Sequence, residues 1–279
     1  MPQPHRALAD AGGGQESAPP PDPPHGASVF FHAWQKMAER AEAQEPNWLS
    51  PVALTSGRLK DELRLDAWRP IAPNGQPDYT LGGGKGLEFI VAPRVQLLLG
   101  IPSFMENPHH EKRDGFGDIP LMMKFRVASA PHKEGDYLLT LLLKATVPTG
   151  SNAAGLHAAV LTPGIAVGKG WGQFDIQSTL GSTLPLADTA ILGRQFLWDT
   201  AFQYQVRKRL WPELEVNSIH YLVGKYEGQT QAFLTPGLGF GRAHLCGPVS
   251  ISAGIGFQIA ATEFHTYNHQ LMLSVRFPF

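Results

Sequence analysis

The chain has 279 residues and a formal net charge of −1, and only 17% of its residues are charged. This even and sparse charge provides no basic surface for nucleic acid, so we expect no nucleic-acid partner. The single cysteine, Cys246, excludes an internal disulfide and a Cys-x-x-Cys metal site, and no apolar run approaches the roughly 18 residues of a membrane-spanning helix.

Residues 1–27 form a leader rich in glycine and proline, including the segment from Pro19 to Pro24. Such a composition cannot bury enough apolar surface to fold, so we predict that the leader is disordered. Ala7-Leu8-Ala9 has the small-x-small pattern of a signal-peptide cleavage site, although no basic and apolar stretch precedes it. We therefore interpret the leader as the remnant of a signal peptide.

Residues 28–56 are predicted to be an N-terminal helix followed by a linker. The helix is expected over 28–44, because apolar residues recur there at spacings of three and four: Phe30, Trp34, Met37 and Ala41. Ser28 is a candidate for its N-cap, and Pro46 prevents its continuation. A helix of this kind can rest on a membrane surface, pack beneath the main domain or insert into it.

From residue 57 to the last residue, apolar side chains recur at every second position. Leu121, Met123 and Phe125, for example, share one face of a segment whose other face carries Lys124 and Arg126. Successive side chains of a strand point to opposite faces, so each segment has one apolar and one polar face. About twelve such segments occur. They are expected near 57–69, 79–91, 94–104, 116–129, 136–148, 157–169, 172–184, 194–206, 213–224, 229–241, 247–262 and 267–279.

This pattern predicts an all-β fold, namely an up-and-down antiparallel transmembrane β-barrel over residues 57–279 with a short N-terminal helix. In a water-soluble barrel of this size the apolar faces would enclose an interior wider than side chains can fill. We therefore expect lipid outside and water inside, with charges of both signs paired across the lumen. The candidate lumen residues are Glu62, Arg64, Glu88, Lys124, Arg126, Lys144, Asp175, Asp199 and Glu215.

The connections and the C-terminal segment point to the outer membrane of a Gram-negative bacterium. The connection from Ser103 to Gly115 is long and is expected outside, whereas Gly168-Lys169-Gly170 is expected to be a tight periplasmic turn. The chain closes on alternating apolar residues and a terminal aromatic, which resembles the strand that barrel-assembly machinery recognises. The candidate assembly signal consists of Leu273, Val275, Phe277 and Phe279.

Two stretches resemble a known family. Residues 115–126, Gly-Phe-Gly-Asp-Ile-Pro-Leu-Met-Met-Lys-Phe-Arg, and residues 144–150, Lys-Ala-Thr-Val-Pro-Thr-Gly, are similar to outer-membrane barrels of the MetA-pathway of phenol degradation family. Gly57-Arg58-Leu59 and the segment 84–88 also resemble its opening strands. The resemblance spans most of residues 57–279 in matching order. It implies uptake of aromatic or hydrophobic compounds and carries no catalytic residues.

Chemical sites receive little support from the sequence. Gly82-Gly83-Gly84-Lys85-Gly86 lacks the Ser or Thr of a phosphate-binding loop, and the loop with His109, His110 and Glu111 is more typical of solvated histidines than of a metal site. Ser218 and His220 stand two apart, as in outer-membrane phospholipases, but in reversed order and without an orienting carboxylate. We expect no enzyme activity, no cofactor and no metal.

Three functions remain open at this stage. The first is a weakly selective channel for small, hydrophobic or aromatic solutes, with outer-membrane lipid around it. The second is a carrier that releases its ligand sideways through the wall at Pro163 or Pro236. The third is a structural barrel whose lumen is blocked by the inserted helix 28–44.

Overall fold

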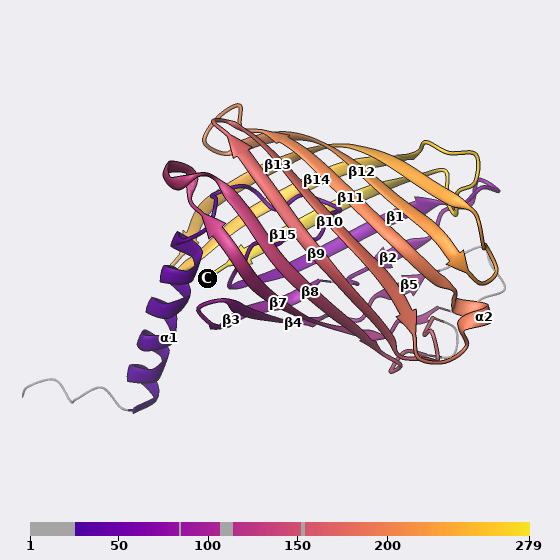
Figure 1. Cartoon of the computed structure of the whole chain (residues 1–279), viewed down its shortest axis with the longest axis horizontal. Helices are drawn as coiled ribbons and strands as arrows, with labels where there is room; N and C mark the ends of the chain where they lie inside the picture. The colour runs from indigo at the N-terminus through magenta and orange to yellow at the C-terminus, as the bar shows by residue number, and fades with distance from the viewer. Residues whose placement is uncertain (1–25, 84, 107–113, 152–153) are drawn as a thin grey trace, which may run out of the picture.

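The computed structural model describes residues 26–83, 85–106, 114–151 and 154–279. Twelve antiparallel strands form a closed barrel, as predicted (Figure 1). They are β1 (Glu62–Ile71), β3 (Gly86–Ala92), β4 (Val95–Gly100), β7 (Ile119–Ala130), β8 (Tyr137–Val147), β9 (Val160–Trp171), β10 (Phe174–Pro185), β11 (Arg194–Tyr204), β12 (Leu210–Val223), β13 (Thr230–Cys246), β14 (Val249–Ala260) and β15 (His269–Pro278).

The barrel closes between its first and last strands. β1 pairs with β15 from Glu62 opposite Pro278 to Ile71 opposite His269. Three short strands, β2 (Tyr79–Leu81), β5 (Phe104–Glu106) and β6 (Gly115–Phe116), extend the sheet beside β1. The helical elements are α1 (Gly26–Ala43), the single turn α2 (Thr189–Leu192) and the 3-10 turn η1 (His132–Glu134). The pairing of β1 with β15 means that neither of these two strands is a free edge of the sheet.

The two ends of the barrel differ in their connections. At one end the strands are joined by tight turns, such as Gly172 and Gln173 between β9 and β10, whereas at the other end the chain runs from residue 101 to 118 between β4 and β7. Both ends of the barrel chain and α1 lie at the short-turn end (Figure 1). Outer-membrane barrels keep their short turns in the periplasm, so this end is the periplasmic rim.

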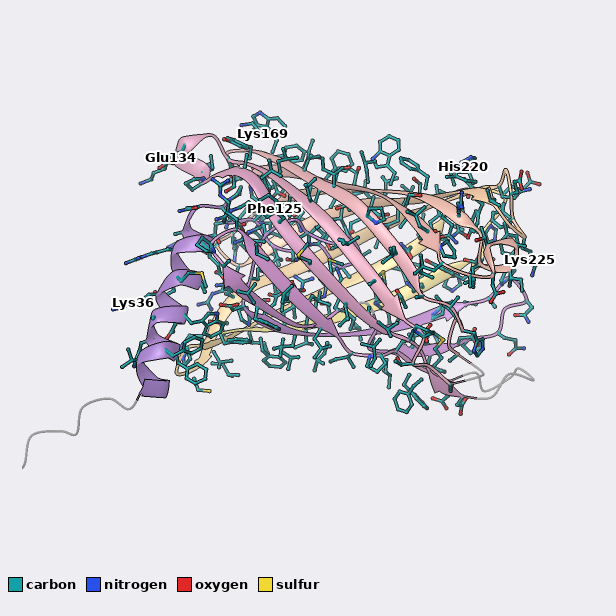
Figure 2. The ribbon with its side chains drawn as sticks, turned by 60° about the horizontal axis from the view of Figure 1, so that its bottom comes forward. Lys36, Phe125, Glu134, Lys169, His220 and Lys225 are labelled. Atoms are coloured by element: carbon teal, nitrogen blue, oxygen red, sulfur yellow. The ribbon has the colours of Figure 1, made fainter. Side chains whose placement is uncertain are left out.

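The outer wall of the barrel is apolar and the inner wall is polar. Leu121, Met123 and Phe125 are 40–43% exposed, whereas Lys124 and Arg126 between them are 3% and 2% exposed. Figure 2 shows Phe125 on the outside of the wall, between Glu134 near one end and Lys225 at the other. A water-soluble protein shows the reverse pattern, so the outer wall faces lipid and the chain is an outer-membrane barrel.

Within the described residues, no helix has the length and apolar content needed to cross a membrane. Helix α1 begins at Gly26, so Ser28 lies inside it and the predicted N-cap is wrong. The helix ends at Ala43, three residues before Pro46. The first strand was predicted from residue 57, but β1 begins at Glu62 because the preceding residues lie inside the lumen.

The prediction of a tight turn at residues 168–170 is also wrong. These residues lie within β9, and the turn follows at Gly172. The two glycines face the interior, where space is short: a Cβ on Gly168 would lie 2.4 Å from Cζ3 of Trp48, and one on Gly170 would lie 2.1 Å from Oδ2 of Asp136. Glycine is needed here for close approach rather than for chain reversal.

Candidate functional site: the lumen and its plug

The segment 44–61, which we call the plug, enters the lumen from the periplasmic rim, turns near Thr55 and returns to the rim. It has no helix or strand, and most of its side chains are buried. Helix α1 lies outside the barrel at the same end (Figure 1). The hypothesis that the helix itself fills the lumen is therefore wrong, because the residues that follow it do so.

Acidic side chains of β12 hold the amide groups of the plug. Oε1 and Oε2 of Glu215 accept hydrogen bonds from the N–H groups of Ala53 and Leu54 at 2.7 and 2.6 Å. Oε1 of Glu213 accepts one from the N–H of Val52 at 3.1 Å. Both carboxylates are buried. Each of these N–H groups thus has a carboxyl oxygen of the wall as its acceptor, so this strand fixes the inward-running half of the plug.

Basic side chains on β1 and β15 hold the carbonyl groups of the same stretch. The Arg276 guanidinium donates to the carbonyl oxygens of Ser50 and Pro51, the latter at 2.9 Å. Arg64 donates to the carbonyl oxygen of Val52 and also pairs with Asp66 at 2.9 Å. The wall thus offers acceptors to the plug amides and donors to its carbonyls. An irregular buried backbone needs such partners, since it has no ladder of its own.

The base of the plug is fixed at the periplasmic rim. Glu45 pairs with Arg126 of β7 at 2.9 Å, and its Oε2 accepts the N–H of Leu59 at 2.9 Å. Nε of Arg58 lies 3.8 Å from the same carboxylate. Glu45 therefore bridges the entering limb, the returning limb and the barrel wall. All three charged side chains are buried, so removal of one would leave an unpaired buried charge.

Lys60 also joins the two limbs. Its ammonium donates to Oγ of Ser50 at 2.6 Å and lies 3.7 Å from Oε2 of Glu62. Burial lowers the pKa of Lys60 to about 7, and the neighbouring Glu62 carboxylate opposes this effect. Water around a withdrawn plug would return the pKa toward its ordinary value. Seating of the plug is thereby linked to proton release.

Two more glycines let the wall approach the plug. A Cβ on Gly254 of β14 would lie 2.7 Å from Cγ2 of Val52. In the plug itself, a Cβ on Gly57 would lie 2.8 Å from Cβ of Ala166. The carbonyl oxygen of Gly57 also accepts a hydrogen bond from Oγ1 of Thr140 at 2.8 Å. Side chains at these positions would force the plug away from the wall.

The nine candidate lumen residues all lie on the inner wall, and they have different neighbours. Arg64, Lys124, Arg126 and Glu215 form hydrogen bonds or ion pairs with the plug. Glu62 lies beside Lys60, and Glu88 pairs with Lys124 at 3.0 Å. Asp175 accepts from Gln177, which also donates to the carbonyl oxygen of Leu49. Lys144 and Asp199 instead line a cavity beyond the plug.

The expectation that these charges mainly pair across open water therefore needs correction, because much of the inner wall binds the plug. Sequence reasoning missed Glu213, Arg276 and Gln177 as plug ligands. Their inward position follows from the same alternation that identified the others. The plug itself was missed because residues 45–56 were interpreted as a linker and residues 57–61 as the start of the first strand. Its mixture of apolar residues and prolines, without any period, was the available signal.

The remaining candidates lie elsewhere. The proposed assembly residues Leu273, Val275 and Phe277 are on the outward face of β15, and Phe279 follows the strand. Ser218 and His220 face outward and do not bond to each other: Ser218 donates to the carbonyl oxygen of Trp198, and His220 lies 2.7 Å from Oγ1 of Thr230. They lack the nucleophile–base hydrogen bond of a hydrolase.

No cluster of three metal-ligating side chains occurs among the described residues. His109, His110 and Glu111 lie outside the described residues, as does Gly84 of the glycine-rich segment. Its neighbours Gly82 and Gly83 have φ angles of 78° and 96°, which supports a turn at this position.

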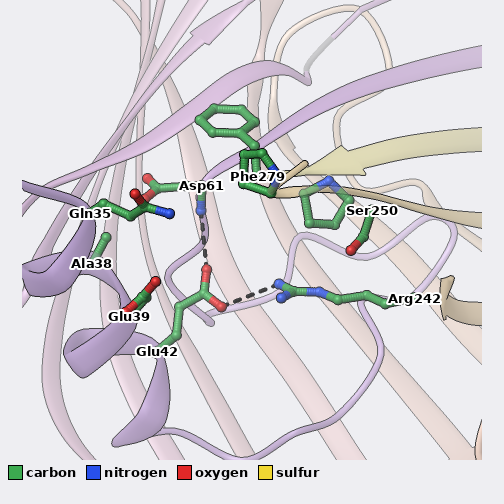
Figure 3. A pocket seen from close by; sticks show the side chains of 10 residues that line it. Gln35, Ala38, Glu39, Glu42, Asp61, Arg242, Ser250 and Phe279 are labelled. Atoms are coloured by element: carbon green, nitrogen blue, oxygen red, sulfur yellow. Dashed lines mark hydrogen bonds and ion pairs between the residues drawn. The ribbon is translucent and has the colours of Figure 1, made fainter. Parts of the chain in front are cut away.

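Helix α1 is attached to the rim beside the plug (Figure 3). The Glu42 carboxylate accepts from Arg242 of β13 at 3.3 Å and from the N–H of Asp61 at 3.3 Å. Indole Nε1 of Trp34 donates to the carbonyl oxygen of Ile90 at 2.7 Å. Through these contacts α1 holds the entering end of the plug close to its returning end.

Comparisons with known proteins place this geometry in context. No family model and no curated protein matches the sequence. Among solved structures, the chain is similar to the NanC porin, with a TM-score of 0.51 and 6% identity over 77% of this chain and 98% of that one. It is also similar to the COG4313 outer membrane channel from Pseudomonas putida F1, with a TM-score of 0.51 and 12% identity over 83% of this chain and 100% of that one.

The fold is that of outer-membrane β-barrels. At these identities the similarity shows the fold alone. The resemblance to the MetA-pathway of phenol degradation family is not confirmed by these comparisons and stays a prediction.

Proposed function

We propose that this protein is an outer-membrane channel for small compounds and that the plug closes it at rest. The observation that carries this proposal is that both ends of the plug lie at the periplasmic rim. A loop tethered in this way can withdraw without unthreading from the barrel. Its backbone is bound to the wall through hydrogen bonds from side chains such as Glu215 and Arg276, which water can replace.

The nature of the solute is inferred from two sources. Both solved structures described above are named as a porin or a channel, which supports transport rather than catalysis. The family resemblance supports hydrophobic or aromatic solutes. Charges of both signs on the inner wall disfavour a strong preference for cations or anions at the constriction. We therefore propose a weakly selective pathway, opened by movement of the plug.

A disulfide lock tests whether the plug must move. Cβ of Val52 lies 3.9 Å from the Cβ position of Gly254, which is within the usual range for a disulfide. Val52→Cys with Gly254→Cys, in a Cys246→Ser background, should join the plug to β14. We expect the oxidised protein to be silent in planar bilayers and the reduced protein to show openings. The Val52→Cys single variant is the control for redox effects without a lock.

Equal conductance and solute uptake in the oxidised and reduced double variant would overturn the gating proposal. A reduced protein that is silent and takes up no solute would overturn the channel itself. Gel migration of heated and unheated samples confirms that each variant forms a closed barrel.

A second candidate, sideways release of ligand, is favoured by gaps in the wall. Pairing between β9 and β10 stops after Gly164–Gly181 and resumes at Leu161–Leu184, and Pro163 lies in this gap. The β13–β14 ladder is interrupted in the same way around Pro236. Proline has no N–H to donate, so the wall is less strongly bonded at both places.

Restoring a donor at each gap tests this candidate. Pro163→Val should slow the uptake of a hydrophobic fluorescent probe while leaving ion conductance unchanged, if the probe leaves between β9 and β10. Pro236→Val is the matched variant for the other gap. Unchanged uptake in both variants would exclude sideways release at these positions.

We also propose that α1 contacts the periplasmic leaflet of the outer membrane. Phe30 and Phe31 are 65% and 61% exposed, and with Trp34 they border an apolar pocket completed by Leu87 and Val91 of the lipid-facing wall. An amphipathic helix of this kind lies in the membrane interface. Brominated lipid should quench the fluorescence of the wild-type protein more than that of Trp34→Phe. Equal quenching would place α1 away from lipid. Recognition by barrel-assembly machinery stays a prediction.

A further inference from the structure

A cavity of about 260 Å³ lies in the lumen on the long-loop side of the plug. Its apolar lining includes Met122, Leu142 and Leu197, which point inward from β7, β8 and β11. Thr55 at the plug tip also lines it. The volume is slightly below the roughly 300 Å³ at which pockets for drug-sized ligands begin, so it suits a small ligand.

Among the described residues that line this cavity, Lys144 is the only basic one. Its side chain is half-buried, and no charged group or hydrogen-bond partner acts on it among the described residues. Lys124, which also faces the lumen, lies 3.0 Å from Glu88. The described part of the wall therefore provides a counter-ion for Lys124 beside the plug and none for Lys144 in the cavity. A cation removed from bulk water without a partner favours an anionic ligand.

The acidic residue of the cavity has its own partner. Oδ1 of Asp199 accepts a hydrogen bond from Nδ2 of Asn217 at 3.2 Å, and no ion pair joins Asp199 to Lys144 in the described part of the chain. The Lys144 ammonium is thus available to an anionic ligand. A second negative charge in so small a cavity would meet the Asp199 carboxylate, which favours a ligand with a single negative charge.

We propose that this cavity binds a small amphipathic carboxylate, whose carboxylate pairs with Lys144 and whose apolar body packs against Met122, Leu142 and Leu197. This inference rests on the proposed function in one respect: it names the class of solute that reaches the plug from outside. The bound solute would touch Thr55. That residue is held by Lys85, which donates to its Oγ1 at 2.9 Å, and by Thr179, which donates to its carbonyl oxygen at 2.9 Å.

Titration calorimetry on the full chain in detergent tests the ligand class with three probes. Benzoate has both a carboxylate and an apolar body, benzyl alcohol has the body without the charge, and acetate has the charge without the body. We expect benzoate to bind roughly ten- to a hundredfold more tightly than either of the others, which is the range for a hydrogen bond to a charged group. Equal binding of benzoate and benzyl alcohol would overturn the proposal.

Substitutions test the assigned residues. Lys144→Met keeps the length of the side chain and removes its charge, so benzoate should then bind no better than benzyl alcohol. Lys225→Met is the matched control, because Lys225 is an exposed lysine at the same end of the barrel (Figure 2). Leu142→Ala should weaken benzoate and benzyl alcohol alike. Unchanged benzoate binding in Lys144→Met would show that the site lies elsewhere.

Conductance measurements separate this inference from the channel proposal. If the protein conducts after the plug is released but binds benzoate no better than benzyl alcohol, the channel proposal stands and the carboxylate site is excluded. If the protein binds benzoate through Lys144 but does not conduct after the plug is released, the carboxylate site stands and the channel proposal is excluded. If Lys144→Met fails to form a barrel by gel migration, Lys144→Gln and the comparison of probes on the wild type decide the question.

Discussion

The two halves of the lumen are built from the same alternating strands, yet they differ in what their polar side chains bind. In the periplasmic half, Glu215, Arg276 and Arg126 bond directly to the plug. In the outer half, Lys144 faces a cavity and has no ion-pair or hydrogen-bond partner among the residues that the structure describes. The difference shows that one pattern of inward polar residues serves two purposes. Where the plug reaches, they satisfy its backbone, and beyond its tip they are free for a solute.

Removal of the plug should abolish this difference between the two halves and have the largest effect on conductance. Replacement of residues 47–57 by a short Gly-Ser linker leaves Glu45 and Arg58 at the rim and empties the periplasmic half. We expect continuous conductance typical of a water-filled barrel in place of rare openings. The measurement is single-channel recording in planar bilayers. Unchanged conductance would mean that the periplasmic half is not where the channel is closed.

Loss of the Glu215 carboxylate should have the next largest effect. Glu215→Ala leaves the buried N–H groups of Ala53 and Leu54 without acceptors, which destabilises the seated plug by about 1–3 kcal/mol. The open fraction, meaning the share of recording time in which the channel conducts, should then rise roughly ten- to a hundredfold. Glu215→Gln keeps one acceptor and should have a smaller effect. Asp199→Ala is the matched change in the outer half and should leave the open fraction close to that of the wild type.

A pH change should act on the periplasmic half through Lys60. Its pKa is lowered to about 7 when the plug is seated, mainly by burial, so the seated form binds fewer protons than the withdrawn form. A rise from about pH 7 to about pH 9 should therefore favour seating and lower the open fraction by up to roughly fiftyfold. Lys60→Met should weaken this dependence. An open fraction that rises with pH in the wild type would contradict the assignment.

A side chain added to the inner wall at Gly168 should have a moderate effect on the open fraction. In Gly168→Ala the new Cβ would lie 2.4 Å from the Trp48 ring, and displacement of the base of the plug should cost about 1 kcal/mol, or roughly fivefold in open fraction. Adding Trp48→Leu to the Gly168→Ala chain should reverse part of the rise in open fraction, because the smaller side chain leaves room for the new Cβ. Equal open fractions in the Gly168→Ala variant with and without that change would show that the contact does not hold the plug.

The smallest effect is expected at the attachment of α1. Arg242 and Glu42 form an exposed ion pair at 3.3 Å, and such pairs contribute little. Arg242→Ala should change the open fraction by about twofold or less. A larger change in bilayer recordings would mean that α1 controls the plug, rather than only holding its entering end near the rim.

Much of the barrel was predictable from the sequence because strand alternation is a local property. Lys124 and Arg126 alternate with Met123 and Phe125 along one strand, and this places the first two inside without any knowledge of the rest of the chain. The same reasoning identified all nine candidate lumen residues. It failed at residues 57–61 and 168–170, where the fold depends on contacts between distant parts of the chain.

Sequence by itself therefore determined the barrel, its inner and outer faces and the charge of its lumen, since each follows from spacing along single strands. Only the tertiary structure decided that residues 44–61 lie in the lumen and that Glu215 binds Leu54 from 161 positions away. It also decided that no described residue is a counter-ion of Lys144. Lys124 and Lys144 both point inward, from the neighbouring strands β7 and β8. Their different surroundings arise because the plug ends at Thr55, and periodicity along a strand carries no information about how far another segment reaches.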